Sequence, residues 1–158
     1  MSTFLGPARP VSLMIAALAL VATAVCAEGT PRAVPPERLD RYWTLANSSL
    51  EAEAPMSGRN LTVPGCVTVA YTIDGNGRTR DFVVVKVAPP SDLGPMAVSL
   101  VRNMHYAPGP GNAMLDAVRT YLIVPFNVPK LANGQVDPVR QQAIMAPCRL
   151  PGFGAAAR

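Results

Sequence analysis

The sequence predicts an α+β domain in which two strands, one helix and a third strand follow one another along the chain. Segments 66–73 and 119–128 alternate apolar residues with others at a period of two, which is typical of strands. Between them, segment 93–104 repeats apolar residues at helical spacing. With 158 residues, 49% of them hydrophobic and 15% charged, the chain has the size and composition of one globular domain.

The first two strands are expected to form a hairpin. The alternation in 66–73 predicts a half-buried strand, with Val67, Val69, Tyr71 and Ile73 on one face and Cys66, Thr68, Ala70 and Thr72 on the other. The following D-G-N-G run at 74–77 supplies the positive-φ positions of a tight turn, and 78–87 is rich in β-branched residues. We therefore expect an antiparallel pair.

The next elements are a helix and the last strand. Ser91 or Asp92 is the expected cap of a helix that ends before Pro108. Its apolar face consists of Leu93, Met96, Ala97, Leu100, Val101 and Met104. In the last strand, Leu122, Val124, Phe126 and Val128 share one face, and Tyr121 and Asn127 are expected on the outward face. Because Pro125 cannot donate a hydrogen bond to a neighbouring strand, we expect this strand at an edge of the sheet.

An amphipathic helix is predicted ahead of the domain, within 37–54. Leu39, Trp43, Ala46 and Leu50 fall at helical spacing there, and Glu37 occupies the first turn. We interpret Trp43 as a core contact, with an exposed ligand platform as the alternative. A second short helix, capped by Asp137, is predicted at 138–145, and a loose tail is expected beyond Cys148.

The N-terminal segment is predicted to be a secretory signal peptide, residues 1–27. Arg9 precedes an apolar stretch at 11–25 that ends in Val25, Cys26 and Ala27, and we expect cleavage after Ala27. An uncleaved anchor is the alternative, although about 15 residues of helix span only ~22 Å of a ~30 Å hydrocarbon core. Lipid attachment at Cys26 fits less well, because Val25 is not the small residue that such signals carry. The expected location is the periplasm, or the inner membrane facing the periplasm if the segment is retained.

Two cysteines remain after such cleavage, Cys66 and Cys148, which lie 82 positions apart. We predict that they pair in an oxidising compartment, where a bridge over this span contributes about 4 kcal/mol by a loop-entropy estimate. The alternative is two buried thiols that act as small hydrophobic groups.

No catalytic, metal or cofactor site is predicted. His105 is the single histidine, and Ser91, Ser99 and Cys66 lie in no recognised nucleophile motif. The D-G-N-G run lacks the remaining oxygen ligands of a calcium loop. The net charge is +4, and the arginines are scattered without a basic run, so nucleic-acid binding is not expected.

Several segments together carry a family resemblance. These are G-C-V-T-V-A-Y-T-I-D-G-N-G-R at 65–78, F-V-V-V-K-V at 82–87, the helix with Ala97, M-H-Y-A-P at 104–108 and V-P-F-N-V at 124–128. In this order they resemble the C-terminal domain of TonB, although Met104, His105 and Tyr106 stand where that family has W-R-F. The expected organisation is a helical segment and loop at 28–64, the TonB-like domain at 65–129 and a tail at 130–158.

The resemblance implies a β-β-α-β two-layer sandwich, with one helix packed on a three-stranded antiparallel sheet. It also implies that the last strand is exposed at an edge and captures an extended peptide of an outer-membrane transporter by β-strand addition. The implied partner-binding residues are Tyr121, Leu122, Ile123, Val124, Pro125, Phe126, Asn127 and Val128.

The expected function is therefore that of a periplasmic binding domain, without enzyme activity or cofactor, for a TonB-dependent outer-membrane receptor or another envelope protein. A membrane-anchored energy transducer is one alternative, although only about 35 residues separate Ala27 from Gly65 in place of a long linker. A structural envelope protein that forms homodimers by strand exchange is another. The last alternative is an enzyme that uses His105.

Overall fold

The computed structural model describes residues 30–47, 51–52 and 55–155. Its elements are β1 (Arg32–Ala33), the 3₁₀ helix η1 (Pro36–Arg41), β2 (Trp43–Leu45), β3 (Gly65–Ile73), β4 (Thr79–Ala88), α1 (Gly94–Arg102), β5 (Tyr106–Pro108), β6 (Val118–Phe126), α2 (Pro138–Met145) and the 3₁₀ helix η2 (Ala146–Cys148). The predicted signal peptide lies outside the described residues. Within the described ranges, no helix is long and apolar enough to cross a membrane.

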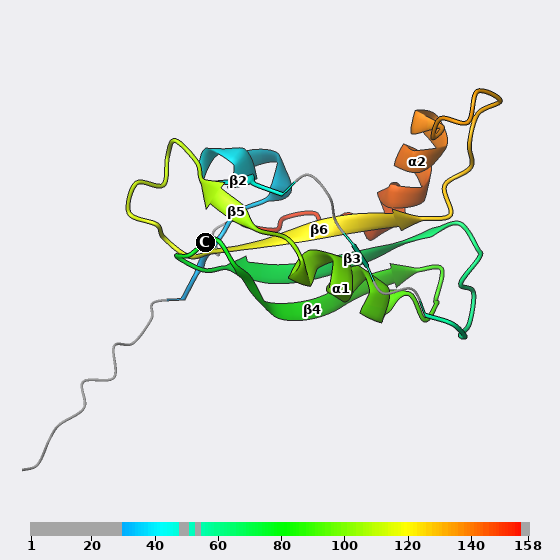
Figure 1. Ribbon diagram of the computed structural model, residues 1–158, viewed down its shortest axis with the longest axis horizontal. Helices are drawn as coiled ribbons and strands as arrows, with labels where there is room; N and C mark the ends of the chain where they lie inside the picture. The colour runs from blue at the N-terminus through cyan, green and yellow to red at the C-terminus, as the bar shows by residue number, and fades with distance from the viewer. Residues whose placement is uncertain (1–29, 48–50, 53–54, 156–158) are drawn as a thin grey trace, which may run out of the picture.

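The main sheet has the strand order β1-β6-β3-β4 (Figure 1). β3 pairs antiparallel with β4 on one side and, along its whole length, with β6 on the other. The predicted order of strands and helix is therefore correct, but the sheet has four strands and not three. The added strand, β1, runs parallel to β6 and pairs only with Val118 and Arg119, the first two residues of β6.

The hairpin between β3 and β4 forms as predicted, and its turn is held by local hydrogen bonds. The Asp74 carboxylate accepts hydrogen bonds from the amides of Asn76 and Arg78, both at 2.9 Å. Gly77 has φ 76°, and a Cβ there would lie 2.0 Å from the carbonyl oxygen of Tyr106. Only glycine fits this position, where the turn passes β5.

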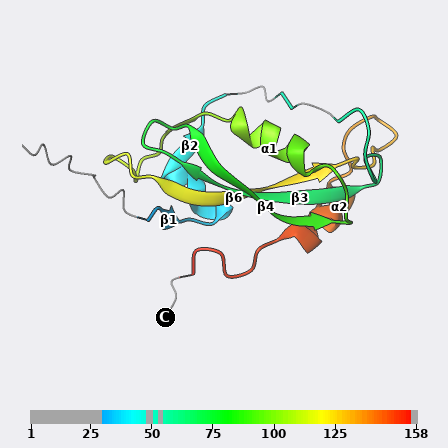
Figure 2. The same cartoon turned by 90° about the horizontal axis from the view of Figure 1, so that it is seen from below.

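One face of the sheet packs against α1 and forms the core (Figure 2). The apolar side chains of β3 and β6 on this face meet Leu93, Ala97, Val101 and Met104, all of which are buried. The predicted apolar face of the helix is confirmed at these four positions. The predicted cap is wrong, because Leu93 occupies the cap position of α1 and no side chain caps the helix.

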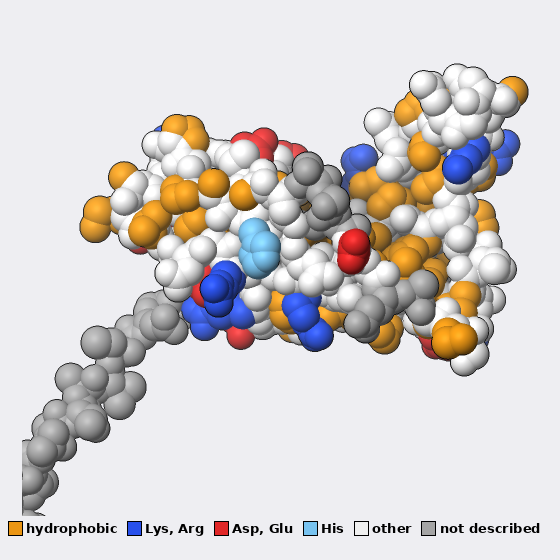
Figure 3. Space-filling model, viewed as in Figure 1, with side chains coloured by type: hydrophobic (Ala, Val, Ile, Leu, Met, Phe, Trp, Pro, Cys, Tyr) orange, Lys and Arg blue, Asp and Glu red, His pale blue; other side chains and the backbone are white. Residues whose placement is uncertain are grey.

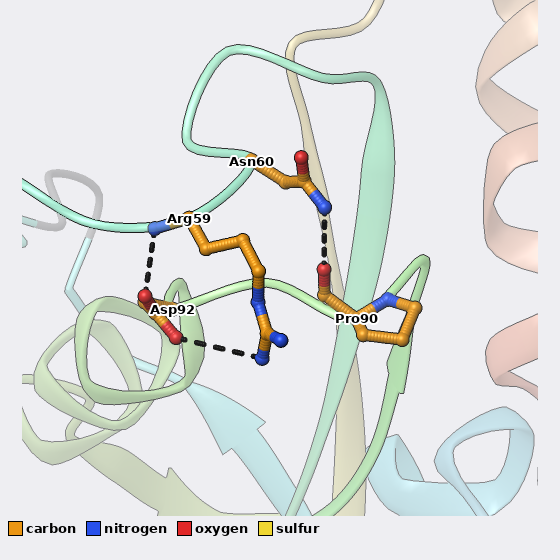
Figure 4. Close-up of polar contacts among 4 residues, drawn as sticks. All are labelled: Arg59, Asn60, Pro90 and Asp92. Atoms are coloured by element: carbon orange, nitrogen blue, oxygen red, sulfur yellow. Dashed lines mark hydrogen bonds and ion pairs between the residues drawn. The ribbon is translucent and has the colours of Figure 1, made fainter.

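Asp92 instead joins the loop before β3 to the segment before α1 (Figure 4). Its carboxylate accepts a hydrogen bond from the Arg59 amide at 2.7 Å and lies 4.0 Å from the Arg59 guanidinium. The side chain of Asn60 donates to the carbonyl oxygen of Pro90 at 2.8 Å. These contacts fix the loop through which the chain enters β3.

The other face of the sheet is covered by the C-terminal segment, which carries α2 and η2 (Figure 2). Cys148 forms the predicted disulfide with Cys66, and its carbonyl oxygen accepts a hydrogen bond from the Thr68 hydroxyl at 2.6 Å. All nine residues of β3 are consequently buried. The prediction of a half-buried strand is wrong, because the disulfide holds the segment that ends at Cys148 against the more polar face of β3. The loose tail expected beyond Cys148 is also wrong for its described residues, since Phe153 packs on Tyr121 of β6.

Over residues 37–47, the N-terminal segment does not form the predicted amphipathic helix, and Leu50 of the predicted stripe lies outside the described residues. η1 ends at Arg41, and Trp43 then pairs with Pro108 in a two-stranded sheet of β2 and β5. Trp43 is fully buried, and its indole N–H donates to the carbonyl oxygen of Asp116 at 3.1 Å. The interpretation of Trp43 as a core residue is confirmed. Trp43 is buried because β2 pairs with β5, however, and not because it lies on the apolar stripe of a helix.

Candidate functional site

The outer edge of β6, the side that faces away from β3, is open beyond β1. The carbonyl oxygen of Arg119 points to this side, because it accepts a hydrogen bond from the Val34 amide at 2.8 Å. Backbone groups of alternate residues in a strand point to the same side, and β6 pairs with β3 without a register shift. The N–H and C=O groups of Tyr121 and Ile123, and the C=O of Pro125, therefore also point outward.

Pro125 occupies a position where the missing N–H removes no bond within the sheet. Opposite Cys66, it belongs to a pair that exchanges no hydrogen bonds between β3 and β6. Within the described part of the chain, the amides of Tyr121 and Ile123 have no hydrogen-bond acceptor. Two outward donors and three outward acceptors thus remain available along this stretch.

A cleft of about 400 Å³ opens at this edge, between η1 and α2. It is lined by Pro36, Glu37, Tyr121, Leu122, Ile123, Met145 and Arg149. A second cleft, of about 470 Å³, shares Glu37, Tyr121 and Arg149 with the first and extends toward Pro147 and Leu150. We call the two together the β6 groove. Figure 3 shows a notch between the α2 part of the surface and the η1–β2 part, with hydrophobic side chains at its floor.

The β6 groove combines an apolar floor with one acidic side chain, Glu37, and two basic side chains, Lys86 and Arg149. Leu122 and Met145 supply hydrophobic surface, while Glu37 of η1 and Arg149 after η2 line both clefts. Sequence reasoning missed Glu37, Met145 and Arg149 as groove residues. The predicted disulfide contained a signal for Arg149, because pairing Cys148 with Cys66 brings the next residue close to β6, which neighbours Cys66 in the sheet.

The predicted partner-binding residues separate into two groups. Tyr121, Leu122, Ile123, Val124, Pro125 and Phe126 lie in β6, whereas Asn127 and Val128 lie beyond its end. Asn127 has φ 52°, and its side-chain amide donates to the carbonyl oxygens of Leu61 and Val63, so it is committed to the loop before β3. The predicted outward orientation of the Tyr121 side chain is also wrong: it is 6% exposed and contacts Phe153.

β4 forms the opposite edge of the sheet. Its residues Val83, Val84 and Val85 are 47%, 40% and 46% exposed. Val84 lies opposite Val69, whose backbone groups point toward β6, so the backbone groups of Val84 point to the open edge. Register shifts interrupt the pairing of β3 with β4, and Asp81 in this strand has φ 56°. Such bulges twist an edge and disfavour regular strand addition.

The side chain of His105 lies on the surface, and its backbone connects three segments. The His105 amide donates to the side-chain oxygen of Asn47 at 3.0 Å, its carbonyl oxygen accepts from the Ala46 amide, and it forms a bridge to Arg78. Among the described residues, no group of three His, Cys, Asp or Glu side chains is arranged to hold a metal ion.

Two tyrosines form a hydrogen-bonded pair at the border of the core. The hydroxyl groups of Tyr71 and Tyr106 lie 2.6 Å apart. Burial raises the pKa of Tyr71 far above its ordinary value, and the charge and hydrogen bond of Tyr106 act in the same direction. Burial also raises the pKa of Tyr106. Both hydroxyls are therefore protonated at neutral pH and act as structural donors and acceptors.

Comparisons with known proteins find similarity to solved structures. No family model matches the chain, and no curated protein matches it in sequence. The solution NMR structure of the Pseudomonas aeruginosa TonB CTD is similar, with a TM-score of 0.46 and 16% sequence identity, over 63% of this chain and 97% of that chain.

Proposed function

We propose that this chain is a periplasmic, TonB-like binding domain that captures an extended segment of an envelope protein by adding it as a strand to β6. The observation that carries the proposal is the outward row of backbone groups from Tyr121 to Pro125 at the edge of the groove between η1 and α2. Strand addition requires an accessible row of this kind, because main-chain hydrogen bonds supply much of the affinity.

The groove also limits the length of the captured segment. β1 occupies the edge at Val118 and Arg119, and the strand ends at Phe126. The open stretch from Tyr121 to Pro125 covers about 17 Å at ~3.3 Å per residue. The expected ligand is a segment of about five residues in extended conformation, with apolar side chains toward Leu122 and Met145.

The motif resemblance suggests the partner class, a TonB-dependent outer-membrane receptor. The direct test uses synthetic peptides from the periplasmic N-terminal segments of such receptors, together with a scrambled peptide as control. A photo-reactive amino acid replaces Glu37 at the rim of the β6 groove, and in a matched variant it replaces Val84 at the β4 edge. Cross-linking from position 37 and not from position 84 supports the proposal. Equal or reversed yields contradict it.

Self-association through β4 is the second candidate function. The observation that favours it is the exposure of three consecutive valines on a strand whose outer edge has no partner among the described residues. Sedimentation with and without receptor peptide separates the two candidates. A dimer that Val84→Lys disrupts, in a protein that binds no peptide, favours self-association.

A further inference from the structure

A separate cleft, on the other side of η1 from the β6 groove, is rich in arginine. It has a volume of about 450 Å³ and is lined by Arg32, Ala33, Val34, Pro35, Arg38, Arg41, Tyr42, Gly154 and Ala155. Three of these residues are cationic and none is acidic. We call this cleft, with Arg32, Arg38 and Arg41, the arginine cleft.

The arginines gather here because η1 is a 3₁₀ helix. With three residues per turn, residues i and i+3 lie on the same side, so Arg38 and Arg41 share one side of the helix. Its acidic residues face elsewhere. Glu37 lines the β6 groove, and the charge of Asp40 acts on Tyr106, whose pKa it helps to raise.

Neighbouring groups hold two of the arginines in place. The Arg32 guanidinium donates a hydrogen bond to the Tyr42 hydroxyl at 3.1 Å and lies 5.9 Å from the centre of that ring. Arg41 packs on the backbone of Gly111, where an added Cβ would lie 2.8 Å from the Arg41 Cγ. The Gly111 amide also donates to the carbonyl oxygen of Arg41 at 2.8 Å. Arg41 therefore needs a residue without a side chain at position 111.

None of the three arginines forms an ion pair with a carboxylate of the described residues. Three guanidinium groups around one cleft, without a carboxylate partner in the part of the chain that the structure describes, favour a ligand with more than one negative charge. Guanidinium groups bind phosphate oxygens through paired, charge-assisted hydrogen bonds. A cleft of 450 Å³ also lies within the usual size range of small-molecule sites. We propose that the arginine cleft binds a phosphoryl group, carried either by a soluble phosphate ester or by a lipid headgroup.

The test measures binding of pyrophosphate, inorganic phosphate and acetate to the full exported protein by calorimetry at constant ionic strength. Pyrophosphate is expected to bind at least tenfold more tightly than acetate. The double variant Arg38→Gln/Arg41→Gln is expected to lose at least tenfold in pyrophosphate affinity. The control Lys130→Gln/Arg140→Gln removes the same charge from the α2 end of the molecule and is expected to stay within twofold.

A second arm distinguishes the two sources of the phosphoryl group. The protein is sedimented with vesicles of phosphatidylcholine alone and with vesicles that also contain phosphatidylglycerol. Sedimentation only with the anionic vesicles, lost in the Arg38/Arg41 double variant, identifies a lipid headgroup. Pyrophosphate binding without sedimentation identifies a soluble ester.

Three results overturn the proposal. The first is equal affinity for acetate and pyrophosphate, the second is unchanged pyrophosphate affinity in an Arg38/Arg41 double variant that melts at the wild-type temperature, and the third comes from the control pair. The control pair guards against a nonspecific charge effect, since an equal loss in both double variants also overturns it. The outcome is independent of peptide capture at β6, because a change such as Ile123→Pro lies outside the arginine cleft and is expected to leave pyrophosphate binding intact.

Discussion

The ring of Phe153 stands edge-on to the ring of Tyr121, with 4.9 Å between the ring centres and 74° between their planes. This contact joins the C-terminal tail to the middle of β6, behind the edge that we propose as the binding site. The tail is thus a structural layer of the domain, and its removal is expected to disturb the β6 groove.

The aromatic contact predicts coupled effects on stability. Tyr121→Ala is expected to lower the free energy of unfolding by about 3 kcal/mol, because it empties a buried aromatic site. Phe153→Ala is expected to cost less, about 1–2 kcal/mol, because Phe153 is only half-buried. Urea unfolding of both single variants and the double variant should give a coupling energy of about 0.5–1.5 kcal/mol. Strict additivity would show that the two rings do not stabilise each other.

The Cys66–Cys148 disulfide closes a span of 82 residues. Replacing both cysteines by serine is expected to lower the free energy of unfolding by about 4 kcal/mol through the larger entropy of the unfolded chain. Chemical unfolding with and without reductant measures this difference. Thiol counting under denaturing, non-reducing conditions provides the check, and two free thiols in protein isolated from the periplasm would contradict the pairing.

The Tyr71–Tyr106 pair predicts sensitivity to alkaline pH. Burial raises the pKa of Tyr71 above its ordinary value of 10.0. The folded protein therefore keeps this hydroxyl protonated at pH values where the unfolded chain ionises it. The contribution of this hydroxyl to the free energy of unfolding is fully present below pH 10. It is lost as the pH rises further, by about 1.4 kcal/mol per pH unit.

Tyr71→Phe tests this effect, because phenylalanine cannot ionise in either state. The variant is expected to lose about 1 kcal/mol at pH 7, where one hydrogen bond to Tyr106 disappears. Between pH 10 and 11 its stability should fall less steeply than that of the wild type. The free energy of unfolding of both proteins is measured by urea unfolding across this range. If it falls equally with pH in the variant and in the wild type, Tyr71 does not cause the alkaline sensitivity.

The sequence predicted the parts of the fold that depend on local patterns. Alternation identified β3 and β6, the D-G-N-G turn identified β4 as the hairpin partner of β3, and helical spacing identified the buried side of α1. The edge position that Pro125 predicted for this strand is wrong in part, because β6 lies between β1 and β3. β1 covers only Val118 and Arg119, however, and leaves the outer side of β6 open at Pro125. Each of these signals arises within a few neighbouring residues, where periodicity and turn chemistry are decisive.

The missed features depend on partners far away in the sequence. β1 and β2 have two and three residues, too few to show a period, and they exist because β6 and β5 pair with them. Trp43 fell on an apparent helical stripe, yet it is buried beside Pro108 in a strand. The three arginines of the arginine cleft looked scattered because a 3₁₀ helix and a strand bring them together. The disulfide implied that a tail covers β3, but alternation alone favoured a half-buried strand.

The most direct test of strand addition at β6 compares one proline substitution at each edge of the sheet. Ile123→Pro removes an outward amide from the β6 groove, and Val84→Pro removes an outward amide from β4. Binding of fluorescently labelled receptor peptides is measured by anisotropy, after circular dichroism has established that both variants are folded. The account predicts at least a tenfold loss of affinity for Ile123→Pro and at most a twofold change for Val84→Pro. A folded Ile123→Pro variant that binds with wild-type affinity would contradict it.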